Sequence, residues 1–366
     1  MKACNIMEDI TRKYLDEMLS MRFDICTCDI CKQDIIAFSL TRIPPKYVLP
    51  DSASFKKIFE ETRVEQSAVV LKELVIAIRT ITANPQHDQG NDREQAYDLL
   101  MKQIKDDRGV DFSHYRDRVL KRRIALRMRA KNVNTYSEYL QVLIHSPEEY
   151  EELFDVLTIN VSSFFRDKPV WDKLKKDIFP ALIEKKLKEH GLRKIRVWSA
   201  GCSHGEEGYS LAITLYELLE KSPEKIKIEI YGNDIDKACL SQARLGQYDK
   251  ESVKTLSPYI LRRFFIPVND KYQVVPHIKE LVQFKERNLI HDPSFPGVDM
   301  VVCRNVFIYF NRSLQEHLIM KYHDALVDGG YFVMGTSENL LGEARQVFST
   351  VDSSCRIYQK ISVKKP

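Results

Sequence analysis

One stretch near the middle of the chain, Arg196–Ile213, limits the possible folds more than any other. Its sequence, RVWSAGCSHGEEGYSLAI, is typical of a buried strand, a turn with two glycines and the start of a helix. Glu206 and Glu207 fall in the first helical turn, where the helix dipole favours carboxylates. In a doubly wound sheet, a nucleotide-like ligand binds where such a strand meets a glycine-rich turn. Because the glycines are spaced GxxxG and not GxGxxG, this turn alone is equally typical of an ordinary strand–helix junction.

Strands and helices alternate through the C-terminal part of the chain. The apolar pattern predicts strands at 195–199, 226–231, 300–303 and 331–334, and helices at 207–221, 236–245 and 314–326. This alternation predicts a parallel α/β sheet. The second strand alternates apolar and charged residues, so we expect it near an edge of the sheet. It is followed by NDID, in which Asp234 is suited to bind a ribose and Asp236 to cap the next helix.

Length, composition and charge restrict the class of protein. A chain of 366 residues with 44% hydrophobic and 30% charged residues is typical of a globular protein with two or three domains. We see no apolar run of about 18 residues and no secretory signal, and therefore expect a cytoplasmic protein without membrane insertion. The net charge of +4 is too small to indicate a nucleic-acid partner for the whole chain.

A polar segment with Pro and Gly, TANPQHDQGNDRE, divides the chain into predicted domains. We expect a helical module at 1–82, a linker at 83–94, a second all-α domain at 95–165 and the domain with the sheet at 166–366.

Five motifs connect the chain with a known family. They are TINVSSFFRD at 158–167, WSAGCSHGEEGYS at 198–210, NDID at 233–236, CRNVFIYF at 303–310 and GTSEN at 335–339. In order and approximate spacing they resemble the CheR chemoreceptor methyltransferases, over about residues 95–360. The resemblance implies all-α domains followed by a Rossmann-like sheet that binds S-adenosylmethionine, with a small antiparallel β-subdomain inserted at about 264–284.

The resemblance also implies an activity. CheR proteins are protein-glutamate O-methyltransferases, which transfer a methyl group from S-adenosylmethionine to glutamate carboxylates on the cytoplasmic helices of chemoreceptors. The sulfonium activates the methyl group and an ionised glutamate is already a nucleophile, so this chemistry requires no general base. What the protein must supply is alignment of the reactants and exclusion of water. The alternative function is a non-catalytic signalling adaptor that keeps the fold to bind the cofactor.

The resemblance assigns roles to individual residues. It puts Asn160, Ser162 and Arg166 at the methionine end of the cofactor, with Arg166 also near the entering carboxylate. Glu207 would bind the amino group of the cofactor and Asp234 its ribose.

The other assigned residues lie later in the chain. Asn288, Leu289, Arg304 and Asn305 would flank the adenosyl group, and Tyr309 would lie near the transferred methyl group.

Three alternatives to these roles remain open. Glu206 would serve as well as Glu207 for the amino group, since both lie in the same helical turn. Arg166 would also suit an interdomain salt bridge, and Tyr309 an ordinary core position.

The segment 114–131 is predicted to form a basic amphipathic helix. It carries eight Lys or Arg residues against one Asp, and its apolar stripe consists of Leu120, Ile124 and Met128. Its cationic face would be free in solvent, bind nucleic acid or dock an acidic protein helix. The resemblance favours docking of the receptor, at Arg127 and Arg129. A base methyltransferase would commonly carry Pro-Pro and an aromatic residue where this chain has CRNVFIY, so we do not expect a nucleic-acid substrate.

Four cysteines stand out in the N-terminal module: Cys4, Cys26, Cys28 and Cys31. Four thiols suffice for a tetrahedral zinc site, but they would equally suit buried positions or a redox role. Residues 5–80 resemble the ComFB (late competence protein) family. That resemblance implies a helical regulatory module that forms a homodimer, with metal binding and a cyclic-di-GMP receptor role in some members. Arg42, Lys46 and Tyr47 would bind phosphate and guanine by charge and stacking, or form a surface turn.

Overall fold

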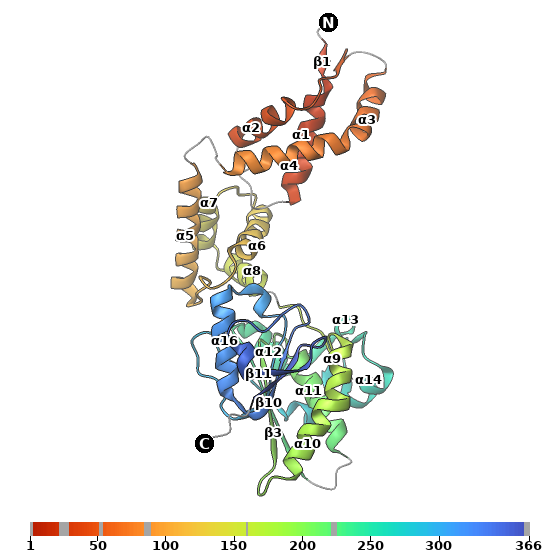
Figure 1. Ribbon diagram of the computed structural model, residues 1–366, viewed down its shortest axis with the longest axis vertical. Helices are drawn as coiled ribbons and strands as arrows, with labels where there is room; N and C mark the ends of the chain where they lie inside the picture. Colours follow the sequence, from red (N-terminus) through yellow and green to blue (C-terminus); the bar gives the residue numbers. More distant parts are fainter. Residues whose placement is uncertain are drawn as a thin grey trace. The chain divides into compact units, whose positions relative to one another are not determined.

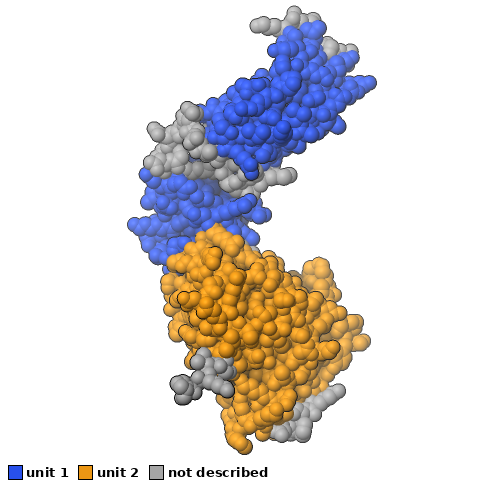
Figure 2. Space-filling view, in the orientation of Figure 1, with its two compact units in different colours: residues 1–113, 117–157 blue, residues 114–116, 158–366 orange. Residues whose placement is uncertain are grey.

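The computed structural model describes residues 3–21, 29–50, 54–83, 89–158, 160–220 and 225–361. No helix within these ranges combines the length and apolarity needed to cross a membrane. The chain forms two compact units, coloured separately in Figure 2. Unit 1 contains residues 1–113 and 117–157, and unit 2 contains residues 114–116 and 158–366. The boundary after residue 157 precedes the predicted one after 165, because Phe164 packs into the core of unit 2.

The first part of unit 1 is a group of helices with a two-stranded antiparallel sheet (Figure 1). Its described elements are β1 (Cys4–Asn5), α1 (Ile6–Met21), α2 (Asp29–Leu40), β2 (Tyr47–Val48), α3 (Phe55–Glu65) and α4 (Ser67–Ala83). The helices pack around their own apolar cluster, which includes Ile10, Ile35 and Leu74. This module therefore buries a core of its own, as expected for a separate domain.

The second part of unit 1 is also helical. Its helices are α5 (Gln89–Arg108), α6 (Asp117–Ala130), α7 (Tyr136–His145) and α8 (Pro147–Thr158). Helix α7 begins with a capping box between Thr135 and Glu138. Helix α6 buries Leu120, Ile124 and Met128, which confirms the predicted apolar stripe.

The basic face of α6 is not entirely free, which corrects part of the prediction. Arg127 donates two hydrogen bonds to the Glu149 carboxylate, at 2.6 and 2.9 Å. This fully buried carboxylate also accepts a hydrogen bond of 2.7 Å from the Tyr139 hydroxyl and lies 3.1 Å from Lys131 Nζ. Arg127 is thus engaged in a structural ion pair within unit 1, whereas Arg129 is exposed. The helical pattern could not reveal this pair, because Glu149 lies on α8, 22 residues from Arg127.

Unit 2 is built on a sheet with the strand order β11-β12-β10-β9-β3-β4-β8. The strands are β3 (Lys194–Ala200), β4 (Lys227–Asp234), β8 (Val282–Glu286), β9 (Val298–Cys303), β10 (Leu326–Met334), β11 (Phe348–Asp352) and β12 (Ile357–Lys360). β12 is antiparallel to both of its neighbours, and the other pairs are parallel. The four predicted strands are confirmed as β3, β4, β9 and β10. β4 is the second strand from one edge of the sheet, next to the edge strand β8, and thus lies near an edge as its alternating pattern indicated.

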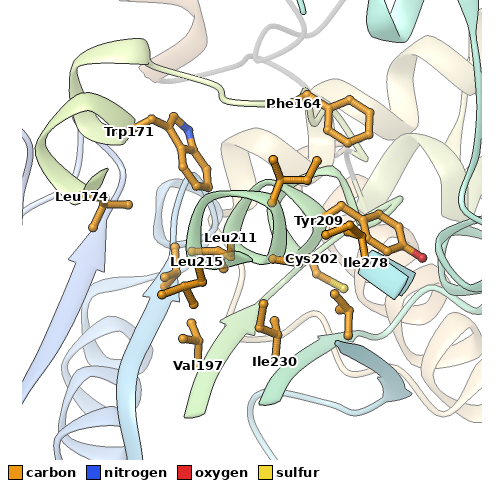
Figure 3. Packing of buried hydrophobic residues seen from close by; sticks show 14 of the residues in the cluster. Phe164, Trp171, Leu174, Val197, Cys202, Tyr209, Leu211, Leu215, Ile230 and Ile278 are labelled. Atoms are coloured by element: carbon orange, nitrogen blue, oxygen red, sulfur yellow. The ribbon is translucent and has the colours of Figure 1, made fainter. Parts of the chain in front are cut away.

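Helices cover both faces of this sheet (Figure 1). They are α9 (Lys168–Lys173), the π-helix η1 (Leu174–Ile178), α10 (Phe179–Leu187), α11 (Glu206–Leu219), α12 (Lys237–Leu245), the 3₁₀ helix η2 (Phe307–Tyr309), α16 (Arg312–Ala325) and α17 (Ala344–Val347). The three predicted helices are confirmed as α11, α12 and α16. Val197 of β3 packs into the cluster that contains Leu211 of α11, which Figure 3 shows. Trp198, the next residue, packs into the cluster that contains Tyr322 of α16, so β3 is buried on both faces.

A small antiparallel sheet is inserted in unit 2, but its extent differs from the prediction of 264–284. Its strands are β5 (Gln247–Asp249), β6 (Phe265–Val268) and β7 (Lys271–Val274), accompanied by α13 (Lys250–Val253), α14 (Pro258–Phe264) and α15 (Pro276–Lys279). The sheet thus begins earlier, at Gln247, and Val282 and Phe284 belong to β8 of the large sheet. The alternating apolar residues of β8 suit a hairpin equally well, and its parallel pairing with β4 cannot be read from that pattern.

We predict that the Arg127–Glu149 pair makes the helical part of unit 1 sensitive to acid. Burial opposes ionisation of Glu149, but the hydrogen bonds from Arg127 and Tyr139 outweigh it and lower its pKa. The contribution of the pair is therefore complete above the unfolded-state pKa of about 4.3 and is lost as the pH falls through the lower folded-state pKa. Glu149→Gln should destabilise these helices by about 3 kcal/mol at pH 7, and by progressively less at lower pH.

Hydrogen exchange of α6 and α8 in the full chain at several pH values measures this effect. Glu151→Gln is the matched control, because Glu151 is an exposed residue of α8 that pairs with Arg108 at the surface. We expect the control to change stability by less than about 1 kcal/mol. Equal effects of the two substitutions would contradict the structural role of the buried pair.

Candidate active site

The candidate site lies at the carboxyl ends of β3, β4 and β9, where the strand order of the sheet reverses. β3 pairs in parallel with β4 on one side and β9 on the other, so the loops after all three strands leave the sheet at the same edge. Open α/β sheets bind their ligands at such a switch point. Four predicted residues, Glu207, Asp234, Arg304 and Asn305, lie at or just beyond these strand ends.

The turn after β3 is held close to the neighbouring loops. Gly201 and Gly205 have positive φ angles of 75° and 90°, which favour glycine. A Cβ atom at Gly201 would lie 2.6 Å from Val306, and one at Gly205 would lie 2.8 Å from the ring of Phe284. The Gly201 amide donates a hydrogen bond of 2.9 Å to the carbonyl of Asn233 at the end of β4. The two glycines therefore allow the turn to pack closely against the loop after β9 and against β8.

Asp234 connects the end of β4 with this turn. Its Oδ2 accepts a hydrogen bond of 2.8 Å from the Ser203 amide, and its Oδ1 accepts one of 2.8 Å from the Ile235 amide. Burial raises the pKa of Asp234, and these amide hydrogen bonds oppose the rise. Asp236 caps α12 by accepting hydrogen bonds from two amides of its first turn, which confirms its predicted role.

A buried guanidinium lies opposite Glu207. Arg304 is almost completely buried and donates hydrogen bonds to Asp167 Oδ2 at 2.6 Å and to the Arg166 carbonyl at 2.9 Å. Its Nη1 lies 3.5 Å from Glu207 Oε2, and Ser199 donates to Glu207 Oε1 at 2.8 Å. Burial raises the pKa of Glu207, and the positive charge of Arg304 opposes the rise. These contacts join the segment before α9, the end of β3, the start of α11 and the loop after β9.

Glu206, the alternative to Glu207, is also buried. Its Oε2 is enclosed without a hydrogen-bond partner in the described part of the chain. Burial raises the pKa of Glu206, and the hydroxyl of Ser162 is among the groups that oppose the rise. Ser162 therefore lies beside Glu206, and its role at the methionine end of the cofactor stays a prediction.

Asn160 and Arg166 belong to the segment before α9, which is part of unit 2. The Asn160 amide donates a hydrogen bond of 2.6 Å to Asp236 Oδ2, beside Asp234. Arg166 donates to the Val161 carbonyl at 2.9 Å, and its positive charge, like that of Arg304, opposes the rise that burial causes in the pKa of Glu207. This segment therefore approaches both Asp234 and Glu207.

Glu338 is a further buried residue beside the candidate site, and no role was predicted for it from the sequence. It lies in the GTSEN motif after β10 and is buried. Its carboxylate accepts hydrogen bonds from the amides of Gly335 at 2.7 Å, Asn305 at 3.1 Å and Ile308 at 3.3 Å. Glu338 therefore fixes the loop after β9. The sequence signals were the GTSEN motif and an acidic residue after an apolar strand, which do not reveal a buried acceptor of several amides.

The three remaining predicted site residues, Asn288, Leu289 and Tyr309, lie in the loops after β8 and β9 and have different contacts. Asn288 Oδ1 accepts a hydrogen bond of 2.9 Å from the Ile290 amide, which closes the turn after β8. Leu289 packs against the apolar cluster beneath α16, and its carbonyl accepts a hydrogen bond from Lys321 at 2.8 Å. Tyr309 ends η2 and is partly buried against the same cluster, so a core contact and a role at the site are compatible.

Several buried polar atoms of the site have no partner among the described residues: Glu206 Oε2, Arg304 Nε and Asn305 Oδ1. Buried polar atoms are normally hydrogen-bonded, so a cluster of this kind fits a site that receives a polar ligand. Around them lie the carboxylates of Glu206, Glu207 and Asp234. These carboxylates suit a ligand with an ammonium group, a sulfonium and ribose hydroxyls, whereas their negative charge would repel a pyrophosphate.

The predicted ligands of the N-terminal module are only partly described. Cys26 and Cys28 lie outside the described residues, Cys31 is buried, and the Cys4 thiol lies 3.4 Å from the Val48 carbonyl. No group of metal-ligating side chains forms within the described ranges, so zinc stays a prediction.

The three residues predicted to bind a regulatory ligand lie just after α2. Arg42 stacks on the Phe38 ring, with its guanidinium carbon 4.0 Å from the ring centroid. Lys46 donates a hydrogen bond of 2.7 Å to Thr62, and the Tyr47 ring is exposed. Arg42 and Lys46 thus already have contacts within the module, and binding of a regulatory ligand by these residues stays a prediction.

Family models match almost the whole chain. The CheR methyltransferase SAM-binding domain matches residues 160–357, and the CheR methyltransferase all-alpha domain matches residues 95–158. The late competence development protein ComFB matches residues 4–85.

Two relatives agree with the CheR matches. The chain is 34% identical over 262 residues to a chemotaxis protein methyltransferase of Listeria innocua, covering 72% of this chain and 97% of that protein. It is also 34% identical over 241 residues to the chemotaxis protein methyltransferase of Salmonella typhimurium, covering 64% and 79%. The solved structure of ComFB from Bacillus subtilis is 22% identical, covers 24% of this chain and 98% of that one, and has a TM-score of 0.21. The chain therefore belongs to the CheR family of S-adenosylmethionine-dependent methyltransferases and carries an N-terminal ComFB domain.

Proposed function

We propose that this protein transfers a methyl group from S-adenosylmethionine to glutamate side chains in the cytoplasmic helical domain of chemoreceptors. The observation that carries the proposal is the meeting of Glu207, Asp234 and Arg304 at the switch point of the sheet. A non-catalytic adaptor would need the fold for binding only. The intact set of Arg166, Glu207, Asp234 and Tyr309 favours the enzyme over the adaptor, because an adaptor would tolerate their loss.

The cofactor would be held along the carboxyl edge of the sheet. Glu207, with Glu206 as the alternative, would accept hydrogen bonds from the amino group, and Asp234 would accept them from the ribose. Asn160 and Ser162 would complete the methionine end. When bound, S-adenosylmethionine supplies a methyl group that its sulfonium has already activated for transfer.

The remaining site residues would flank the adenosyl group and align the substrate. Asn288, Leu289 and Asn305 would line the adenosyl side, where Arg304 fixes the neighbouring loops. Arg166 would hold the entering carboxylate by charge, and Tyr309 would lie beside the transferred methyl group. Since a glutamate is ionised at neutral pH, the protein need only align it and exclude water.

The receptor would dock on the exposed side of α6. The exposed residues that recur there at helical spacing are Arg118, Arg122, Leu126 and Arg129, and three of these four are arginines. This set, the arginine stripe, replaces the predicted pair of Arg127 and Arg129, since Arg127 is bound to Glu149. A cationic stripe with an apolar centre suits an acidic amphipathic helix.

The ComFB domain would regulate the enzyme. Arg42, Lys46 and Tyr47 would bind cyclic-di-GMP, with Tyr47 exposed for stacking. Apolar side chains exposed on one helix suit contact with a second copy of the chain: Val69, Leu71, Val75 and Ile76 of α4. Binding of the ligand would change the activity by favouring one of two conformations.

Transfer of radiolabelled methyl groups from S-adenosylmethionine to chemoreceptor fragments tests the main proposal. We expect a base-labile ester on glutamate residues, and a change in rate when cyclic-di-GMP is added. Cofactor binding without transfer to any receptor fragment would favour the adaptor. An equal rate with and without cyclic-di-GMP would contradict the proposed regulation alone.

Substitution of the two buried glutamates tests the binding of the amino group. Glu207→Gln should weaken binding of S-adenosylhomocysteine about 10- to 100-fold, because a charged hydrogen bond is lost. Isothermal titration calorimetry measures the affinity, and thermal unfolding without ligand shows whether the site is intact. Glu217→Gln, on the same helix but paired with Lys175, is the control and should bind normally. If only Glu206→Gln loses affinity for S-adenosylhomocysteine, the amino group is bound by Glu206 and not by Glu207.

Substitution of the arginine stripe tests receptor docking. The double variant Arg118→Gln/Arg122→Gln should raise KM for receptor fragments about tenfold and weaken the dependence of KM on salt. At saturating receptor its kcat should remain within about twofold, because the receptor then still occupies α6 and neither residue belongs to the candidate active site. Lys188→Gln removes a similarly exposed charge directly after α10 and should change neither constant. A wild-type KM in the double variant would rule out docking on this face.

A further inference from the structure

Three residues, His114–Arg116, belong to unit 2 although the chain on both sides of them belongs to unit 1. Within unit 2 they lie antiparallel to Tyr309–Asn311, with Tyr115 opposite Phe310. We call His114–Arg116 the strap. It is the start of the segment 114–131, which was predicted to be helical throughout, whereas α6 begins only at Asp117.

The strap holds the backbone of Tyr309–Asn311 by hydrogen bonds. The Arg116 amide donates to the Tyr309 carbonyl at 2.8 Å, and the Asn311 amide donates to the His114 carbonyl at 2.8 Å. Arg116 Nε donates to the Phe310 carbonyl at 3.0 Å. Each residue of this segment therefore has a backbone group bound to the strap.

An aromatic contact adds to these hydrogen bonds. The rings of Tyr115 and Phe310 are perpendicular, at 89°, with their centroids 4.9 Å apart. This edge-to-face arrangement is favourable and fixes the direction of both rings. Burial raises the pKa of Tyr115, and the charge of Asp234 adds to the rise, so the phenol is neutral and within the electrostatic reach of that carboxylate.

The segment with Tyr309 has little structure of its own. η2 spans only three residues, and Asn305 before it has a positive φ of 59°. Glu338 holds the first half of the segment through the amides of Asn305 and Ile308. The strap holds the second half, which contains Tyr309.

We propose that the strap positions Tyr309 for methyl transfer, with Tyr115 and Arg116 acting as positioning residues. The inference rests on the proposed function, since it takes Tyr309 to lie beside the transferred methyl group. A displacement of about 1 Å in such a site can lower a rate about 100-fold without abolishing binding. The strap would therefore govern the rate of transfer and not the affinity for either substrate.

The test uses Tyr115→Ala and Arg116→Met in the full chain. We expect kcat for receptor fragments to fall at least about tenfold, while KM for the receptor and the affinity for S-adenosylhomocysteine stay within about threefold. Amides of residues 309–311 should exchange with deuterium faster in both variants, because the strap no longer holds this half of the segment, whereas the Asn305 and Ile308 amides stay bound to Glu338. Tyr115→Phe retains the ring and should restore at least half of the wild-type kcat.

Arg312→Met is the matched control. Arg312 is an exposed arginine directly after the segment, but it pairs with Glu316 of its own helix and donates no hydrogen bond that the strap accepts. This variant should leave kcat and the deuterium exchange of the amides in the Tyr309–Asn311 segment unchanged.

Two results would overturn the proposal while the proposed function stands. The first is a wild-type kcat in both strap variants, and the second is a loss of kcat that only follows a comparable loss of cofactor binding. A wild-type protein that methylates no receptor fragment would instead contradict the proposed function, and the role of the strap with it.

Discussion

The buried guanidinium of Arg304 holds the candidate active site together. A charge removed from water is costly unless it is paired, and Arg304 is paired with Asp167 and lies close to Glu207. These partners come from the segment before α9 and from the start of α11, so one side chain fixes three parts of the chain. The same contacts prevent Glu207 from being an isolated buried carboxylate. Ligand binding can therefore use a carboxylate that is already desolvated and oriented.

The sequence predicted the sheet better than it predicted the contacts. Apolar runs identified β3, β9 and β10, because strands buried on both faces need continuous apolar residues, and the alternation of apolar and charged residues identified β4. β8 was assigned to the inserted subdomain, since a half-buried edge strand has the same alternation as a hairpin. Arg127 was predicted to be free because its partner Glu149 is on another helix, and a helical pattern describes only one element at a time.

The site residues likewise divide into those that could be predicted from the sequence and those that could not. Glu207, Asp234 and Arg304 follow strand ends, so the resemblance and the strand pattern together brought them to one edge of the sheet. Glu338 and the strap act through backbone amides and carbonyls, which the sequence does not distinguish from those of any other residue. Their roles depend on pairing between distant segments and become visible only when the fold is known.

The strap directly precedes α6 in the chain. The chain passes between the two units after residues 113, 116 and 157. The residue after the strap, Asp117, is the first of α6, the helix that carries the arginine stripe. A receptor helix that binds the stripe would therefore act on an element that is covalently joined to the backbone partner of Tyr309. Because Glu338 fixes the other half of that segment independently, a shift of the strap would move Tyr309 relative to Asn305 without opening the loop after β9. Substrate docking and alignment at the methyl group would then be coupled through three residues, and the contacts proposed between the cofactor and Glu207 and Asp234 would not change.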